Sequence, residues 1–127
     1  MPRLPAITAP SDENRAAFDY LMKTRGPAFL RGGFAVMLAS PDVCQRIAHL
    51  GSYVRFDSPV PKLFRELAAT TASAELENPW EYTVHAQQCR ELGVSETVVR
   101  AILERAPVSG ASDDELLAVG LARDLAG

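Results

Sequence analysis

Residues 78–95 read NPWEYTVHAQQCRELGVS, and this stretch carries the clearest helix signals in the chain. Asn78 is a preferred residue at a helix N-cap, and Pro79 suits the first helical position. Gly93 suits the left-handed residue that commonly follows the end of a helix. The stretch therefore predicts one well-delimited helix over about residues 79–92.

Signals of the same kind continue in both directions, and no segment shows convincing strand alternation. Ser11 is a candidate N-cap for the first helix, and Ser112 with Glu115 forms a capping box for the last. The run at 34–38 is too short for its length to separate helix from strand, and we interpret it as a helix. The predicted helices cover about residues 11–25, 34–38, 41–54, 63–76, 79–92, 95–106 and 112–127. The sequence therefore predicts an all-α fold, a single helical bundle of about six or seven helices.

The size and composition of the chain restrict its function. Its 127 residues fit one compact domain, 1–127, with a modest core. A net charge of −3 without a basic cluster argues against nucleic acid or an anionic membrane as partner. We expect a cytoplasmic protein, because no spanning segment or signal peptide is evident. Cys44 and Cys89 are far apart in the sequence, and we expect two reduced thiols.

Glu81 and His85 are the best candidates for chemistry in the predicted helix. They are four residues apart, so they share a helix face, and a carboxylate beside an imidazole can move a proton near neutral pH. Two simpler roles remain open. Glu81 sits where a glutamate commonly reaches back to the N-cap amide. His85 lies on a helical stripe with Tyr82, Cys89 and Leu92, which we expect to face the core. A metal site is weaker, because the pair supplies at most two ligands and His49 has no evident spacing relation to it.

Two further residues have competing interpretations. Glu66 falls with Thr70 on the polar side of its predicted helix, so periodicity alone predicts a solvated carboxylate. Cys89 lies one turn beyond His85, where an imidazole can lower a thiol pKa and make a nucleophile. A buried and inert Cys89 thiol fits the pattern better.

A family resemblance adds to this interpretation. Arg65-Glu66-Leu67-Ala68, followed by Asn78 to His85 and then Gly93-Val94-Ser95, resembles the carboxymuconolactone decarboxylase and alkylhydroperoxidase D-like superfamily. One branch of it carries Cys-x-x-Cys-x-x-x-His, and a decarboxylase-like branch carries Glu-x-x-x-His, the form present here. Glu66 lies twelve residues before Asn78, matching the upstream acid of the family, and this replaces the solvated interpretation. The resemblance extends weakly from Leu4 to about Leu125.

The resemblance implies an all-α fold and assembly into trimers, hexamers or related rings, with active sites near subunit boundaries. It also implies a cofactor-free decarboxylase acting on a small carboxylated lactone or related acid, in which His85 with Glu81 or Glu66 transfers a proton. Arg55, Arg65 and Arg90 are candidates for a single cationic contact with the substrate.

Two other functions remain open on the same scaffold. Thiol peroxidase activity is disfavoured, because positions 78 and 81 carry no cysteine and Cys89 has no resolving partner nearby. A non-catalytic oligomeric or ligand-binding protein is the stronger alternative. Longer decarboxylase-like relatives continue past the position of Gly127 with helices that help to wall the pocket. Two possibilities stay open: a neighbouring subunit supplies that surface, or the chain has kept the fold and lost the chemistry.

Overall fold

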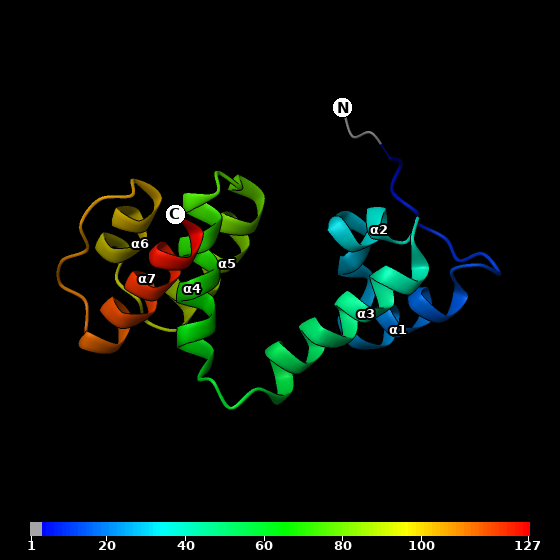
Figure 1. Cartoon of the computed structure of the whole chain (residues 1–127), viewed down its shortest axis with the longest axis horizontal. Coiled ribbons are helices and arrows are strands. Elements are labelled where there is room, and N and C mark those ends of the chain that lie inside the picture. Colours follow the sequence, from blue (N-terminus) through cyan, green and yellow to red (C-terminus); the bar gives the residue numbers. More distant parts are fainter. Residues whose placement is uncertain (1–3) are drawn as a thin grey trace. The chain divides into compact units, whose positions relative to one another are not determined.

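The computed structural model describes residues 4–127, which form an N-terminal unit ending at Ser58 and a C-terminal unit, Pro59–Gly127 (Figure 1). Helices and turns make up both units, and the described residues contain no strand. The predicted all-α fold with about seven helices is therefore confirmed, whereas a single domain over 1–127 stays a prediction. Within residues 4–127, every helix is too short or too polar to cross a membrane.

The N-terminal unit has three α-helices joined by short segments of other helical types. The predicted short helix near residue 34 is confirmed as α2. The π-helical segment closes with a hydrogen bond from the Ser58 amide to the Tyr53 carbonyl oxygen, 2.8 Å long. The elements are α1 (Arg15–Arg25), a 3₁₀ segment (Gly26–Arg31), α2 (Gly33–Met37), α3 (Pro41–Ser52) and a π-helical segment (Tyr53–Asp57).

The start of α1 differs from the prediction. Ser11 does not cap the helix; instead its amide donates a 2.8 Å hydrogen bond to the buried side chain of Asn14, the residue at the N-cap position. The Asn14 side chain therefore organises a turn before the helix, and α1 begins four residues later than Ser11. An edge-to-face contact between Phe18 and Phe29, with ring centroids 5.2 Å apart, anchors the core of this unit.

The C-terminal unit has four helices, and its caps follow the sequence closely. The Asn78 side chain accepts the Glu81 amide, the Ser95 side chain accepts the Val98 amide, and the predicted capping box of Ser112 and Glu115 is present. These contacts satisfy amides that a helix start would otherwise leave without partners. The helices are α4 (Lys62–Glu75), α5 (Pro79–Glu91), α6 (Glu96–Leu103) and α7 (Asp113–Ala126).

Helices α4 and α5 form a tight hairpin, in which one face of α4 packs against one face of α5. Glu77 turns the chain with a left-handed φ of 54°, and the Asn78 amide donates to the Ser73 carbonyl oxygen at 2.8 Å. Helix α7 also packs against α4 (Figure 1). The core between these helices is apolar, and its fully buried members include Leu67, Ala86, Cys89, Val99 and Ile102. Burial of this apolar surface stabilises the unit and fixes which residues of α4 and α5 face each other.

Candidate active site

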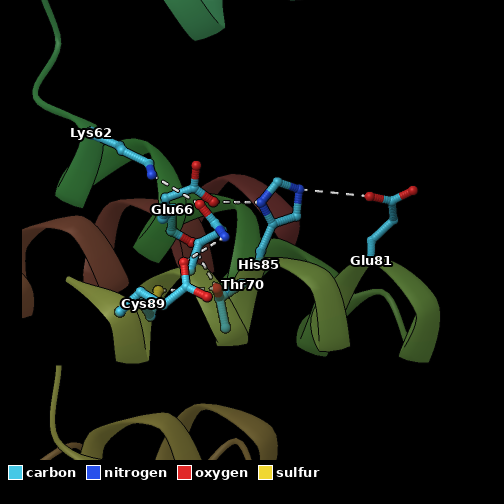
Figure 2. Close-up of polar contacts among 8 residues, drawn as sticks. Lys62, Glu66, Thr70, Glu81, His85 and Cys89 are labelled. Atoms are coloured by element: carbon cyan, nitrogen blue, oxygen red, sulfur yellow. Dashed lines mark hydrogen bonds and ion pairs between the residues drawn. The ribbon is translucent and has the colours of Figure 1, made fainter. Parts of the chain in front are cut away.

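Glu66 of α4 and His85 of α5 meet across the helix hairpin (Figure 2). The Glu66 Oε2 atom lies 2.7 Å from the His85 Nδ1 atom, a short and charge-assisted contact. The Glu66 side chain is only 13% exposed and that of His85 is 30% exposed. Nineteen positions separate the two residues, so only the packing of α4 on α5 brings them together. The structure thus places Glu66 beside the histidine, not on a solvated face.

Glu81 lies on the other side of the same imidazole. Its Oε2 atom is 3.6 Å from His85 Nε2, and its side chain is 47% exposed. The predicted reach of Glu81 back to the Asn78 backbone amide is not formed, because that amide donates to the Ser73 carbonyl oxygen instead. The carboxylate therefore turns toward His85, while the Glu81 amide alone takes part in the cap at 3.2 Å from Asn78 Oδ1.

The two carboxylates face different nitrogens of the imidazole, and the contact with Glu66 determines the role of Nδ1. An ionised carboxylate only accepts hydrogen bonds, so His85 Nδ1 carries the proton that faces Glu66. The opposite nitrogen, Nε2, faces Glu81 across a gap too long for a direct hydrogen bond. Such a carboxylate–imidazole–carboxylate arrangement is suited to general acid–base chemistry.

Thr70 supports the pair from beneath. It is fully buried, and its hydroxyl lies 2.7 Å from the Glu66 carbonyl oxygen and 3.3 Å from Cys89 Sγ. Because a hydroxyl has one hydrogen, donation to Glu66 leaves the Thr70 oxygen to accept from the Cys89 thiol. Periodicity alone placed Thr70 on the polar side of its helix, and that interpretation was wrong.

Cys89 has the properties of a structural thiol. It is fully buried, and this burial is the largest cause of its raised pKa. A raised pKa leaves less thiolate at neutral pH, and the thiolate is the reactive form. The predicted inert thiol fits this environment better than a nucleophile does. In the stripe that we predicted to face the core, Tyr82 and Cys89 are buried, whereas His85 is only half-buried and Leu92 is exposed.

Lys62 was not predicted from the sequence. It begins α4 one turn before Glu66, and its Nζ atom donates a 2.9 Å hydrogen bond to Gln88 Oε1 on α5. Gln88 in turn donates to Glu91 Oε2 at 2.9 Å. A positive charge therefore lies on the same side of the hairpin as Glu66 and His85 (Figure 2). The signal that could have identified Lys62 is its four-residue spacing from Glu66.

The three arginines considered from the sequence have different surroundings. Arg90 of α5 forms a two-pronged ion pair with Glu96, at 2.7 and 3.1 Å, which occupies its guanidinium. Arg65 is the neighbour of Glu66 on α4. Arg55 belongs to the π-helical segment of the N-terminal unit, where its guanidinium lies over the Phe56 ring.

The histidines are not paired with each other within the described residues. His49 belongs to the N-terminal unit, where its ring contacts that of Tyr20 at a centroid distance of 4.2 Å. Across residues 4–127, no three side chains of histidine, cysteine, aspartate or glutamate are arranged to hold a metal ion.

Comparison with protein families gives one match. The family model described as the carboxymuconolactone decarboxylase family matches residues 41–124, which include both helices of the site. This range begins later than the resemblance inferred from the sequence, which started at Leu4. No curated protein and no solved structure matches the chain significantly.

Proposed function

This chain belongs to the carboxymuconolactone decarboxylase family, and from that premise we propose that it is a cofactor-free decarboxylase of a small carboxylated lactone or related acid. The observation that carries the proposal is the 2.7 Å contact of Glu66 with His85, with Glu81 on the far side of the ring. A fixed imidazole with one nitrogen available is the minimum that a proton transfer to carbon requires.

In the proposed reaction the carbon–carbon bond to the substrate carboxylate breaks and carbon dioxide leaves. The electron pair of the broken bond stays on the substrate and is delocalised into the unsaturated lactone. The His85 imidazolium then gives the proton on Nε2 to the carbon atom of the lactone that carries this negative charge. Solvent restores the proton to the ring. Glu66 acts as a positioning residue that holds the ring and stabilises its charged form, and Glu81 adds a second negative charge beside Nε2.

Lys62 is the cation that we propose to bind a carboxylate that stays on the substrate, not the carboxylate that leaves as carbon dioxide. Its ammonium group is exposed, and its described partner is the neutral amide oxygen of Gln88. An incoming carboxylate would replace this neutral contact with a charge-assisted one. This role suits Lys62 better than Arg90, which already pairs with Glu96.

We also propose that the chain works as a homo-oligomer, a trimer or hexamer. On α5, Trp80 and Val84 are exposed on either side of Glu81, and on α7 Leu117, Leu121 and Leu125 are exposed. Large apolar side chains that gather on a surface mark interaction sites. Light scattering on a sizing column measures the native mass; a ring of three or more chains would support this proposal, and a folded monomer would contradict it.

The test of the reaction is the substitution His85→Gln, which keeps the size and polarity of the side chain and removes its titration. We expect turnover of a carboxylated lactone, followed as carbon dioxide release, to fall by about 10²–10⁴-fold. His49→Gln is the matched control, because it changes the other histidine in the N-terminal unit. Turnover that survives His85→Gln would exclude the proposed proton transfer.

The alternative function is a non-catalytic oligomeric or ligand-binding member of the family. A wild-type protein that assembles and binds the acid, yet shows no turnover of any carboxylated lactone or muconate-type acid, would favour it. Thiol peroxidase activity fits less well, because Cys89 is buried and its pKa is raised. Peroxide consumption that needs a dithiol donor and is lost in Cys89→Ala would revive that function.

A further inference from the structure

The C-terminal unit contains a small cavity whose lining shares no residue with the Glu66–His85 contact. The volume of this cavity is about 280 Å³. An apolar cavity of about 150 Å³ can hold a benzene molecule, so the space is large enough for one substituted ring. Apolar side chains form much of the lining, together with one carboxylate and one guanidinium group. These residues are Ala74, Pro79, Tyr82 and Leu103, with Glu77 and Arg105 as the charged pair.

Both charged residues have a backbone conformation that side chains rarely adopt. Glu77 follows the end of α4 with a φ of 54°, and Arg105 follows the end of α6 with a φ of 53°. Among residues 4–127, no other residue except glycine has a positive φ. Glycine is usual at this position after a helix, as at Gly93 after α5, because a left-handed conformation costs a side chain free energy. Residues held in such a conformation cluster at binding sites.

The two unusual residues contact each other at the cavity. Arg105 Nη2 lies 2.8 Å from Glu77 Oε1, and Arg105 Nε donates a 3.2 Å hydrogen bond to the Ala74 carbonyl oxygen. The side chains of Arg105 and Glu77 are 43% and 78% exposed, so solvent screens their ion pair and its contribution to stability is small. A guanidinium has five N–H donors and a carboxylate has two oxygens, so these contacts leave donors and an acceptor oxygen for a ligand.

We propose that this cavity binds a small phenol, a single aromatic ring that carries a hydroxyl group. The ring packs against Tyr82 and Leu103, where aromatic and apolar contacts are favourable. The hydroxyl donates to the Glu77 carboxylate and accepts from the Arg105 guanidinium, because a hydroxyl can do both at once. A neutral ligand fits better than an anion, since the Glu77 carboxylate repels negative charge. The site is independent of the proposed decarboxylation, because Glu66, Glu81 and His85 do not line it.

The test is a titration of the full chain with 4-fluorophenol, followed by fluorine NMR. We expect saturable binding to the wild type and at least about tenfold weaker binding to Arg105→Gly, which loses a charged hydrogen-bond donor. Glycine suits the left-handed backbone, and the Ala74 carbonyl oxygen still accepts from the Glu77 amide at 3.2 Å. The melting temperature of Arg105→Gly should therefore stay close to that of the wild type. Arg100→Gln is the matched control: it removes the same charge from an exposed position on α6 outside the cavity and should leave the affinity unchanged.

Further measurements establish which groups of the ligand and of the cavity make the contact. Leu103→Ala should weaken binding by removing one wall, and it spares the core because Leu103 is 54% exposed. Fluorobenzene, which has no hydroxyl, and 4-fluorobenzoate, which is an anion, should both bind more weakly than 4-fluorophenol. His85→Gln should not change the affinity.

Four results would overturn the proposal. The first is an absence of saturable binding to the wild type, and the second is equal affinities of Arg105→Gly and Arg100→Gln. The third is an equal affinity of the wild type for fluorobenzene and for 4-fluorophenol. The fourth is binding that is lost in His85→Gln but kept in Leu103→Ala, which would place the phenol at the other site.

Discussion

The two units of this protein use their charged residues in opposite ways. In the C-terminal unit, Glu66 and Glu81 place negative charge on both sides of His85. In the N-terminal unit, Arg25 bonds to hydroxyl and carbonyl oxygens and shares a cavity with Arg55. The imidazole is thus flanked by groups of opposite charge, whereas the Arg25 guanidinium is held by neutral acceptors. The two units place their charged groups in different surroundings.

Each unit also contains one buried cysteine, and these thiols allow the two units to be compared by experiment. Cys44 and Cys89 are fully buried, and burial raises the pKa of each. We expect iodoacetamide to modify both at least about a hundredfold more slowly in the native chain than in denaturant, since access requires local unfolding. Mass spectrometry of tryptic peptides gives the two rates separately.

The order of the two rates distinguishes the units further. Cys89 should react more slowly than Cys44, because Cys89 lies in the larger apolar core. The polar contacts of the two thiols also differ. Cys89 contacts Thr70 at 3.3 Å, whereas Cys44 has only a weak contact of 3.9 Å with the Phe34 carbonyl oxygen. Thr70→Val should speed the modification of Cys89 without affecting Cys44. Faster modification of Cys89 than of Cys44 in the wild type would show that the C-terminal unit is the less stable one.

The next largest effect concerns the two carboxylates around His85. Glu66→Gln should lower kcat by about 10–100-fold, because an amide that replaces the carboxylate no longer stabilises the imidazolium or fixes its tautomer. Glu81→Gln should have a smaller effect, because Glu81 is more exposed and lies 3.6 Å away instead of 2.7 Å. Steady-state kinetics of each variant, together with its thermal unfolding, separate positioning from fold disruption.

Glu66→Gln should leave KM little changed, because Glu66 acts on the imidazole and not on the substrate. A purely structural role of Glu66 would instead lower the thermal stability of the variant together with its activity. Equal effects of Glu66→Gln and Glu81→Gln would remove the distinction that we draw between the two carboxylates.

A smaller effect is expected at Lys62. Lys62→Gln should raise KM for the acid substrate by up to about tenfold and change kcat little, because the charge acts on the bound carboxylate and not on the reacting carbon. Lys23→Gln is the matched control, since the chain has only these two lysines and Lys23 lies on α1. Steady-state kinetics of the two variants decide whether Lys62 binds substrate; an unchanged KM in Lys62→Gln would remove that role.

The sequence predicted the elements well where a local rule applied. The N-caps at Asn78, Ser95 and Ser112 and the left-handed glycine after α5 depend on neighbouring residues only, and the structure contains all of them. Ser11 was wrongly predicted because Asn14, three residues later, takes the N-cap position and its buried side chain accepts the Ser11 amide. The capping rule does not reveal that this side chain is used in the turn before the helix.

The site was less predictable, because it depends on the packing of α4 against α5. Periodicity assigned Glu66 and Thr70 to a solvated face of α4. The sequence pattern of one helix does not reveal that a second helix, here α5, covers that face. The family spacing corrected Glu66, but it gave no indication of Thr70 or Lys62. The direction of Glu81 also depended on a long-range contact, because the amide that it was predicted to bind is satisfied by Ser73.

The smallest effect that we predict lies on the surface of the C-terminal unit, at the ion pair of Arg90 and Glu96. The hydrogen bond from Arg90 lowers the pKa of Glu96 below its ordinary value of 4.5. The pair therefore adds stability above that ordinary value and loses it as the pH falls through the lowered one. Because Glu96 is fully exposed, solvent screens the pair, and its contribution to stability is small.

The test is to measure the melting temperature between pH 3 and 7. In Glu96→Gln, the melting temperature should lack only the part of its pH dependence that comes from this pair. In Glu104→Gln, an exposed control, that part should remain.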